Sequence, residues 1–85
     1  MAEADTELLE RIQIDKPYRL LGFESAKVGF DQLEQEVSGT LEMLSDEIIQ
    51  YLEQRTAHID DEKDRKMAMD HLETRIRIQK MRQQS

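Results

Sequence analysis

The sequence predicts an all-α protein with a short N-terminal helix and a helical hairpin. In the hairpin, a long acidic helix packs against a basic C-terminal helix. Apolar residues recur at steps of three and four through the middle of the chain, and acidic and basic residues are segregated along it. The 85 residues, 38% of them apolar and 36% charged, suffice for one small core. We therefore expect a single helical domain over residues 1–85.

The N-terminal region predicts a short helix over residues 6–14. Leu8, Leu9 and Ile12 fall on one face of this segment and are expected to point inward. The helix is expected to end by Lys16, because the residue before a proline disfavours helical backbone. The following PYRLLG stretch, residues 17–22, predicts a turn or a single helical turn that Gly22 closes.

The middle of the chain predicts one long helix over residues 24–55. Nine apolar residues fall within about 100° of arc on this helix: Phe23, Ala26, Phe30, Leu33, Val37, Leu41, Leu44, Ile48 and Leu52. Three of them lie at an eleven-residue spacing, which favours a straight or slightly right-handed helix over a heptad coiled coil. The weak helix formers at positions 38–40 can mark a kink. Since the apolar phase holds across them, we expect the helix to continue.

The apolar stripe ends near Ile59, and a smaller stripe begins at Ala68 on a rotated face. We therefore predict a turn near Thr56–Asp60 and a C-terminal helix over residues 61–82. Thr56, Asp60 and Asp61 are residue types that cap helices. The RTAHIDDEKD stretch contains no glycine, so a continuous helix through residues 55–64 is the alternative.

The two predicted helices carry opposite charge. Residues 28–54 contain seven acidic residues and no lysine or arginine, whereas residues 63–85 contain seven basic and three acidic residues. This asymmetry predicts that the segments lie side by side, either within one chain or between two copies.

Self-association is expected because the longer helix has apolar surface that the shorter one cannot cover. The two helices span about 48 Å and about 33 Å at 1.5 Å per residue. The sequence predicts a dimeric helical bundle with an interface at Phe23, Phe30, Leu33, Val37 and Leu41. The far side of the C-terminal helix predicts a second protein-binding surface at Met67, Ile78 and Met81.

Residues with catalytic or ligand-binding chemistry are scattered through the sequence. The absence of cysteine excludes disulfides and thiolate sites. His58 and Glu62 have metal-ligand spacing but lack a third ligand, and a calcium-loop alignment of residues 60–71 fails at its glycine and closing glutamate positions. We predict no enzyme activity, no cofactor and no metal. The C-terminal basic face is interrupted by Asp70 and Glu73 and lacks aromatic residues, so direct nucleic-acid binding is not expected.

A membrane span is not expected, because the sequence has no apolar run near the roughly 18 residues that a spanning helix requires. The acidic start also lacks the basic and apolar layout of a signal peptide, which predicts a cytoplasmic location.

These features predict a small non-enzymatic protein–protein interaction module, such as an adaptor, assembly factor or chaperone-like protein. It is expected to act through its helical surfaces and by self-association as a homodimer, with a further protein partner possible. The alternative is an acidic inhibitor, in which the carboxylates of residues 28–54 imitate a DNA backbone and block a basic nucleic-acid-binding partner.

Overall fold

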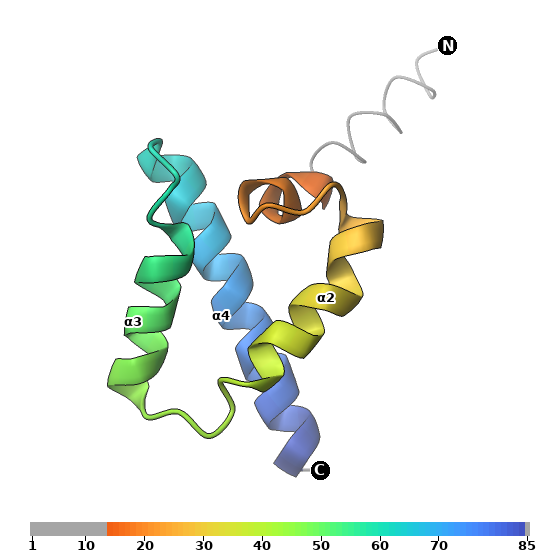
Figure 1. Ribbon diagram of the computed structural model, residues 1–85. Coiled ribbons are helices and arrows are strands. Elements are labelled where there is room, and N and C mark those ends of the chain that lie inside the picture. The colour runs from red at the N-terminus through yellow and green to blue at the C-terminus, as the bar shows by residue number, and fades with distance from the viewer. Residues whose placement is uncertain (1–13, 85) are drawn as a thin grey trace.

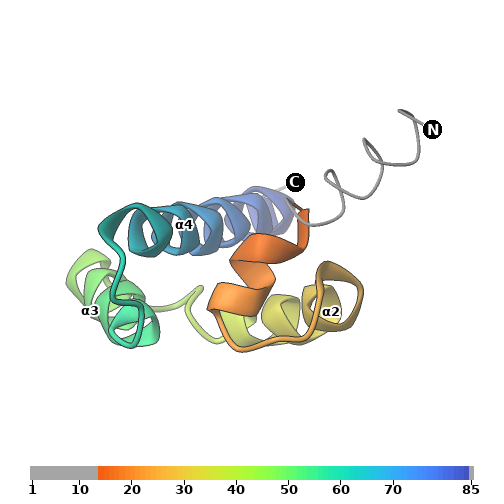
Figure 2. The ribbon, with the colours of Figure 1, turned by 90° about the horizontal axis from the view of Figure 1, so that it is seen from above.

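The computed structural model describes residues 14–84, and this part of the chain contains four helical segments and no strand. A helical segment over residues 14–20 is followed by α2 (Ala26–Ser38), α3 (Ser45–Thr56) and α4 (Glu62–Gln84). α2 and α3 flank α4 in Figure 1, and the view from above in Figure 2 shows both on the same side of it. The all-α prediction is confirmed. The helix predicted over residues 6–14 lies outside the described residues except for its last position.

The segment over residues 14–20 continues through Pro17, so the expected helix end by Lys16 is wrong. Tyr18 and Leu21 are buried. The packing of these side chains outweighs the tendency of Lys16, the residue before proline, to avoid helical backbone. Gly22 ends the segment as predicted. Its φ of 99° is left-handed, and the N–H of residue 23 donates to the Tyr18 carbonyl at 2.9 Å, in the geometry of a Schellman motif.

α2 begins with two side-chain acceptors. The Ser25 hydroxyl accepts the Val28 N–H at 3.3 Å, and the Asp15 carboxylate accepts the Ala26 N–H at 2.8 Å. These contacts satisfy two of the four N–H groups that a helix start leaves without intrahelical partners. Because Asp15 belongs to the preceding helical segment, its contact also fixes that segment against the start of α2.

The single helix predicted over residues 24–55 is wrong, because residues 39–44 interrupt it. Thr40 is buried at this break, and its hydroxyl donates to the Val37 carbonyl at 2.7 Å, in the last turn of α2. The Glu47 carboxylate accepts the Leu44 N–H at 3.1 Å at the start of α3. Side chains therefore satisfy backbone groups on both sides of the break.

α2 and α3 both pack against α4. Each helix carries its own apolar face, and the six-residue connection happens to preserve the sequence spacing between the two faces. The weak helix formers at positions 38–40 correctly signalled the interruption of the helix. The continuous periodicity therefore combined the apolar faces of two separate helices.

The predicted turn between the last two helices is confirmed, with α3 ending at Thr56 and α4 beginning at Glu62. The Asp61 carboxylate accepts the Asp64 N–H at 3.0 Å and so caps α4. The Arg65 guanidinium donates to the Ile59 carbonyl from Nε at 3.0 Å and from Nη2 at 2.7 Å. Positive φ angles within residues 14–84 are confined to Gly22, so this turn needs no glycine.

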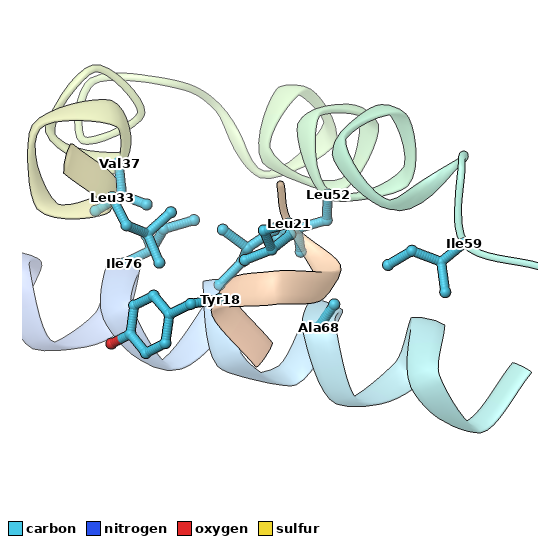
Figure 3. Close-up of a cluster of buried hydrophobic side chains, with 9 residues drawn as sticks. Tyr18, Leu21, Leu33, Val37, Leu52, Ile59, Ala68 and Ile76 are labelled. Atoms are coloured by element: carbon cyan, nitrogen blue, oxygen red, sulfur yellow. The ribbon is translucent and has the colours of Figure 1, made fainter. Parts of the chain in front are cut away.

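Every helical segment contributes to one hydrophobic core, shown in Figure 3. Its buried members are Tyr18, Leu21, Leu33, Val37, Leu52, Ile59, Ala68, Leu72 and Ile76. α4 supplies the last three of these residues. The helical segment over residues 14–20 places Tyr18 between α2 and α4, so it completes the core that those helices begin.

We predict that Gly29→Ala lowers the free energy of unfolding. An added Cβ would lie 2.8 Å from the Phe23 Cβ and 2.9 Å from the Tyr18 Cδ1, and such overpacking costs about 1–3 kcal/mol. This cost exceeds the gain of about 1 kcal/mol in helix propensity. Urea denaturation measures the difference. Gly39→Ala is the control, because its Cβ would meet the nearest atom, the Glu36 carbonyl oxygen, at 3.4 Å and its φ of −71° suits alanine. Equal effects of both substitutions would contradict the close contact.

Candidate protein-binding surfaces

An apolar groove of about 280 Å³ lies between α3 and α4, and we call it the α3–α4 groove. Its lining residues are Ser45, Ile48, Ile49, Leu52, Glu73, Ile76, Arg77 and Lys80. The two helices meet at the turn over residues 57–61 and separate away from it, as Figure 1 shows. The groove lies along the separating portions, which carry the first half of α3 and the second half of α4. Ile49 is 52% exposed there, so a large apolar side chain faces solvent beside the groove.

The two flanks of the α3–α4 groove carry opposite charge. Asp46 and Glu53 are exposed and lie three residues before and four residues after Ile49, which places all three on one flank of α3. Arg77 and Lys80 line the groove from α4 together with the acidic Glu73, so this flank has a net positive charge. Arg77 also pairs with Glu73 on its own helix, at 2.6 Å, but its side chain is 74% exposed and therefore remains accessible.

A polar cluster centred on Glu34 joins α2 to α4. The Glu34 carboxylate accepts hydrogen bonds from Arg75 and from the Gln79 amide, the latter at 3.0 Å, and Arg82 lies 3.5 Å away. The Arg75 guanidinium also lies over the Phe30 ring, 4.2 Å from its centroid. For these residues, the predicted pairing of the acidic and basic segments occurs within one chain.

A second cluster joins α2 to α3. The Glu36 carboxylate accepts hydrogen bonds from the Tyr51 hydroxyl and from Arg55 Nε, the latter at 2.8 Å. Burial alone would raise the pKa of Glu36, but these hydrogen bonds and the positive charge of Arg55 together outweigh burial and hold the pKa below its usual value. Burial and the neighbouring carboxylate raise the pKa of Tyr51. Both groups therefore keep the protonation states that stabilise the contact between the helices.

His71 lies in the same buried region as Arg75. Its ring meets the Tyr18 ring edge-on, with the centroids 4.7 Å apart. Its Nε2 is buried and has no hydrogen-bond partner among the described residues. Burial, followed by the positive charge of Arg75, lowers the pKa of His71. The neutral ring is therefore the form that this site favours.

The predicted self-association surface is only partly available. Leu33 and Val37 are fully buried in the core of the chain itself, so assigning them to a surface between copies was wrong. The reason is that α2 packs on α4. A single long helix could not have packed on α4 along its whole length. Phe23 and Leu41 are half-buried, and Phe30 is 42% exposed beside Arg75. A contact between copies at these three residues stays a prediction.

The second predicted surface does share one face of α4. Met67, Ile78 and Met81 fall within about 60° of arc at 100° per residue. Met81 is 69% exposed, Met67 is 39% exposed, and Ile78 is half-buried. Protein binding at this face stays a prediction. The sequence prediction did not include Ile49, because this residue lies outside the apolar stripe to which Ile48 belongs. Two adjacent apolar residues on a helix cannot both face the core, so the pair itself was a signal that one of them is exposed.

The described residues contain no group of three or more potential metal ligands arranged to hold an ion. Between residues 14 and 84, no helix is both long and apolar enough to cross a bilayer. Comparisons of the chain with protein-family models, with curated proteins and with solved structures find no significant match.

We predict that Glu34→Gln lowers the free energy of unfolding by about 2 kcal/mol, because it weakens charge-assisted hydrogen bonds at a largely buried site. Glu34 and Arg75 are only 19% and 13% exposed, so solvent replaces these contacts poorly. Chemical denaturation gives the value. Glu42→Gln removes the same charge from an exposed position and is expected to change stability by less than about 0.5 kcal/mol. A Glu34→Gln effect as small as that of Glu42→Gln would show that the cluster contributes little.

We predict that stability decreases as pH falls below the unfolded-state histidine pKa of about 6.5. The folded-state pKa of His71 is lower than the unfolded-state value, so the unfolded chain binds the proton more readily and protonation favours unfolding. The free energy of unfolding stops decreasing for this reason once pH falls below the folded-state pKa of His71. His71→Phe should flatten this dependence between about pH 5.5 and 7.5, as followed by urea denaturation. A His71→Phe profile identical to that of the unmodified chain would refute the assignment.

Proposed function

We propose that this protein is a small non-enzymatic protein–protein interaction module, of the adaptor, assembly-factor or chaperone-like kind, that binds a partner through the α3–α4 groove. The supporting observation is the groove itself, in which Ile48, Ile49 and Ile76 form an apolar surface with charged residues at its edges. Protein interfaces commonly place a large apolar side chain in such a site and surround it with a polar rim.

The energetic argument rests on Ile49. Complete burial of an isoleucine side chain is worth on the order of 2 kcal/mol, and this residue remains half exposed in the single chain. A partner that covers Ile49 and fills the groove recovers that contribution. The polar clusters around Glu34 and Glu36 also support the proposal. Their hydrogen bonds join α2 to α4 and α2 to α3, and so hold the two helices that form the groove in place.

The alternative is an acidic inhibitor that imitates DNA and blocks a basic nucleic-acid-binding partner. Asp46, Glu47 and Glu53 favour it, because they are exposed together on α3. Glu34 and Glu36 weigh against a continuous array, since their carboxylates accept hydrogen bonds from residues of the same chain. Competition with duplex DNA for a basic partner, weakened by added salt, would favour this alternative over the groove.

Site-specific photocrosslinking tests the groove as the binding site. A photoreactive amino acid replaces Ile49 in the full chain, which is then irradiated in the cells that produce it. We expect a crosslinked protein adduct, because a bound partner would cover this position. The matched control carries the photoreactive residue at Lys27, which is exposed on α2 and does not line the groove. The same adducts from both positions, or none from position 49, would overturn the proposal.

A further inference from the structure

We propose that the α3–α4 groove binds the same groove of a second copy and forms a two-fold symmetric dimer. This inference rests on the proposed function, since it names the partner of that groove. It also moves the contact between copies away from the α2 surface predicted from sequence, where Leu33 and Val37 are buried in the chain's own core.

The charge pattern of the groove is self-complementary. One flank, on α3, presents Asp46 and Glu53. The other, on α4, presents Arg77 and Lys80 beside the acidic Glu73, so it keeps a net positive charge. When the two-fold axis runs along the groove, each flank of one copy meets the opposite flank of its partner, so both acid–base contacts form at once. A chain with net charge −7 repels its own copy over most orientations. The groove is a place where that repulsion is replaced by attraction.

The apolar part of the groove is also self-complementary. Ile49 stands at the edge of α3 and is half exposed, whereas Ile48, Leu52 and Ile76 line the space between the helices. In the two-fold arrangement, Ile49 of each copy enters the other copy's groove and is covered on both sides. Four helices, α3 and α4 of each copy, then surround one shared apolar centre.

The acid–base complementarity allows a reciprocal charge-reversal test in the full chain. The first variant carries Asp46→Lys and Glu53→Lys, and the second carries Arg77→Glu and Lys80→Glu. Each variant alone places like charges on both flanks, so we expect the dissociation constant of its own dimer to rise about 100-fold. An equal mixture restores both acid–base contacts. Mass measurement by sedimentation equilibrium should therefore show dimers in the unmodified chain and in the mixture, and monomers of each variant alone.

A matched variant controls for net charge and folding. Lys27→Glu with Lys63→Glu changes the net charge as much as the second variant does, at exposed positions outside the groove, and should remain dimeric. Circular dichroism confirms that every variant keeps its helix content. Failure of the mixture to form dimers overturns the inference, as does growth of the unmodified chain beyond a dimer.

The same measurements separate this inference from the proposed function. A monomeric unmodified chain whose position 49 still crosslinks to a different protein would overturn the dimer and leave the proposed function standing. A dimer that all the groove variants retain would place the contact between copies elsewhere. An adduct at position 49 with twice the mass of the chain supports both proposals.

Discussion

The fold depends on covering one narrow apolar stripe of α4, formed by Ala68, Leu72 and Ile76. Long polar side chains border this stripe, so helices that cover it must also supply hydrogen-bond acceptors. The Ile59 carbonyl accepts from Arg65, and Glu34 accepts from Arg75 and Gln79. Burial of the stripe and satisfaction of its polar borders therefore require the same neighbours. Segments that are distant in sequence become fixed around α4 for both reasons.

This requirement explains why the middle of the chain is two helices. One straight helix over residues 24–55 would cross α4 along a single line and leave one edge of its stripe uncovered. With a break at residues 39–44, Val37 on α2 and Leu52 on α3 both reach the core. Burial of Thr40 at the break, with its hydroxyl bonded to the backbone, shows that the interruption is itself a packed part of the structure.

The features that sequence analysis predicted correctly are local. Gly22 ends a helical segment because its backbone is left-handed, and Asp61 starts α4 because its carboxylate caps the first turn. The features that it missed depend on segments far apart in the chain. The passage of a helix through Pro17 follows from the packing of neighbouring residues, and the burial of Leu33 follows from contact with α4. Periodicity identifies an apolar face but does not name the element that covers it.

The break at residues 39–44 also divides the acidic stretch into two parts with different environments. Glu34 and Glu36 on α2 have cationic or hydroxyl partners within the chain, so their charges contribute to the fold. Asp46 and Glu53 on α3 are exposed and lie on the same flank as Ile49. Acids that already have partners contribute little to recognition, whereas exposed acids beside an uncovered apolar side chain give an interface both orientation and affinity. On this reasoning, the proposed binding surface includes the α3 part of the acidic stretch, next to the basic residues of α4, and leaves out the α2 part.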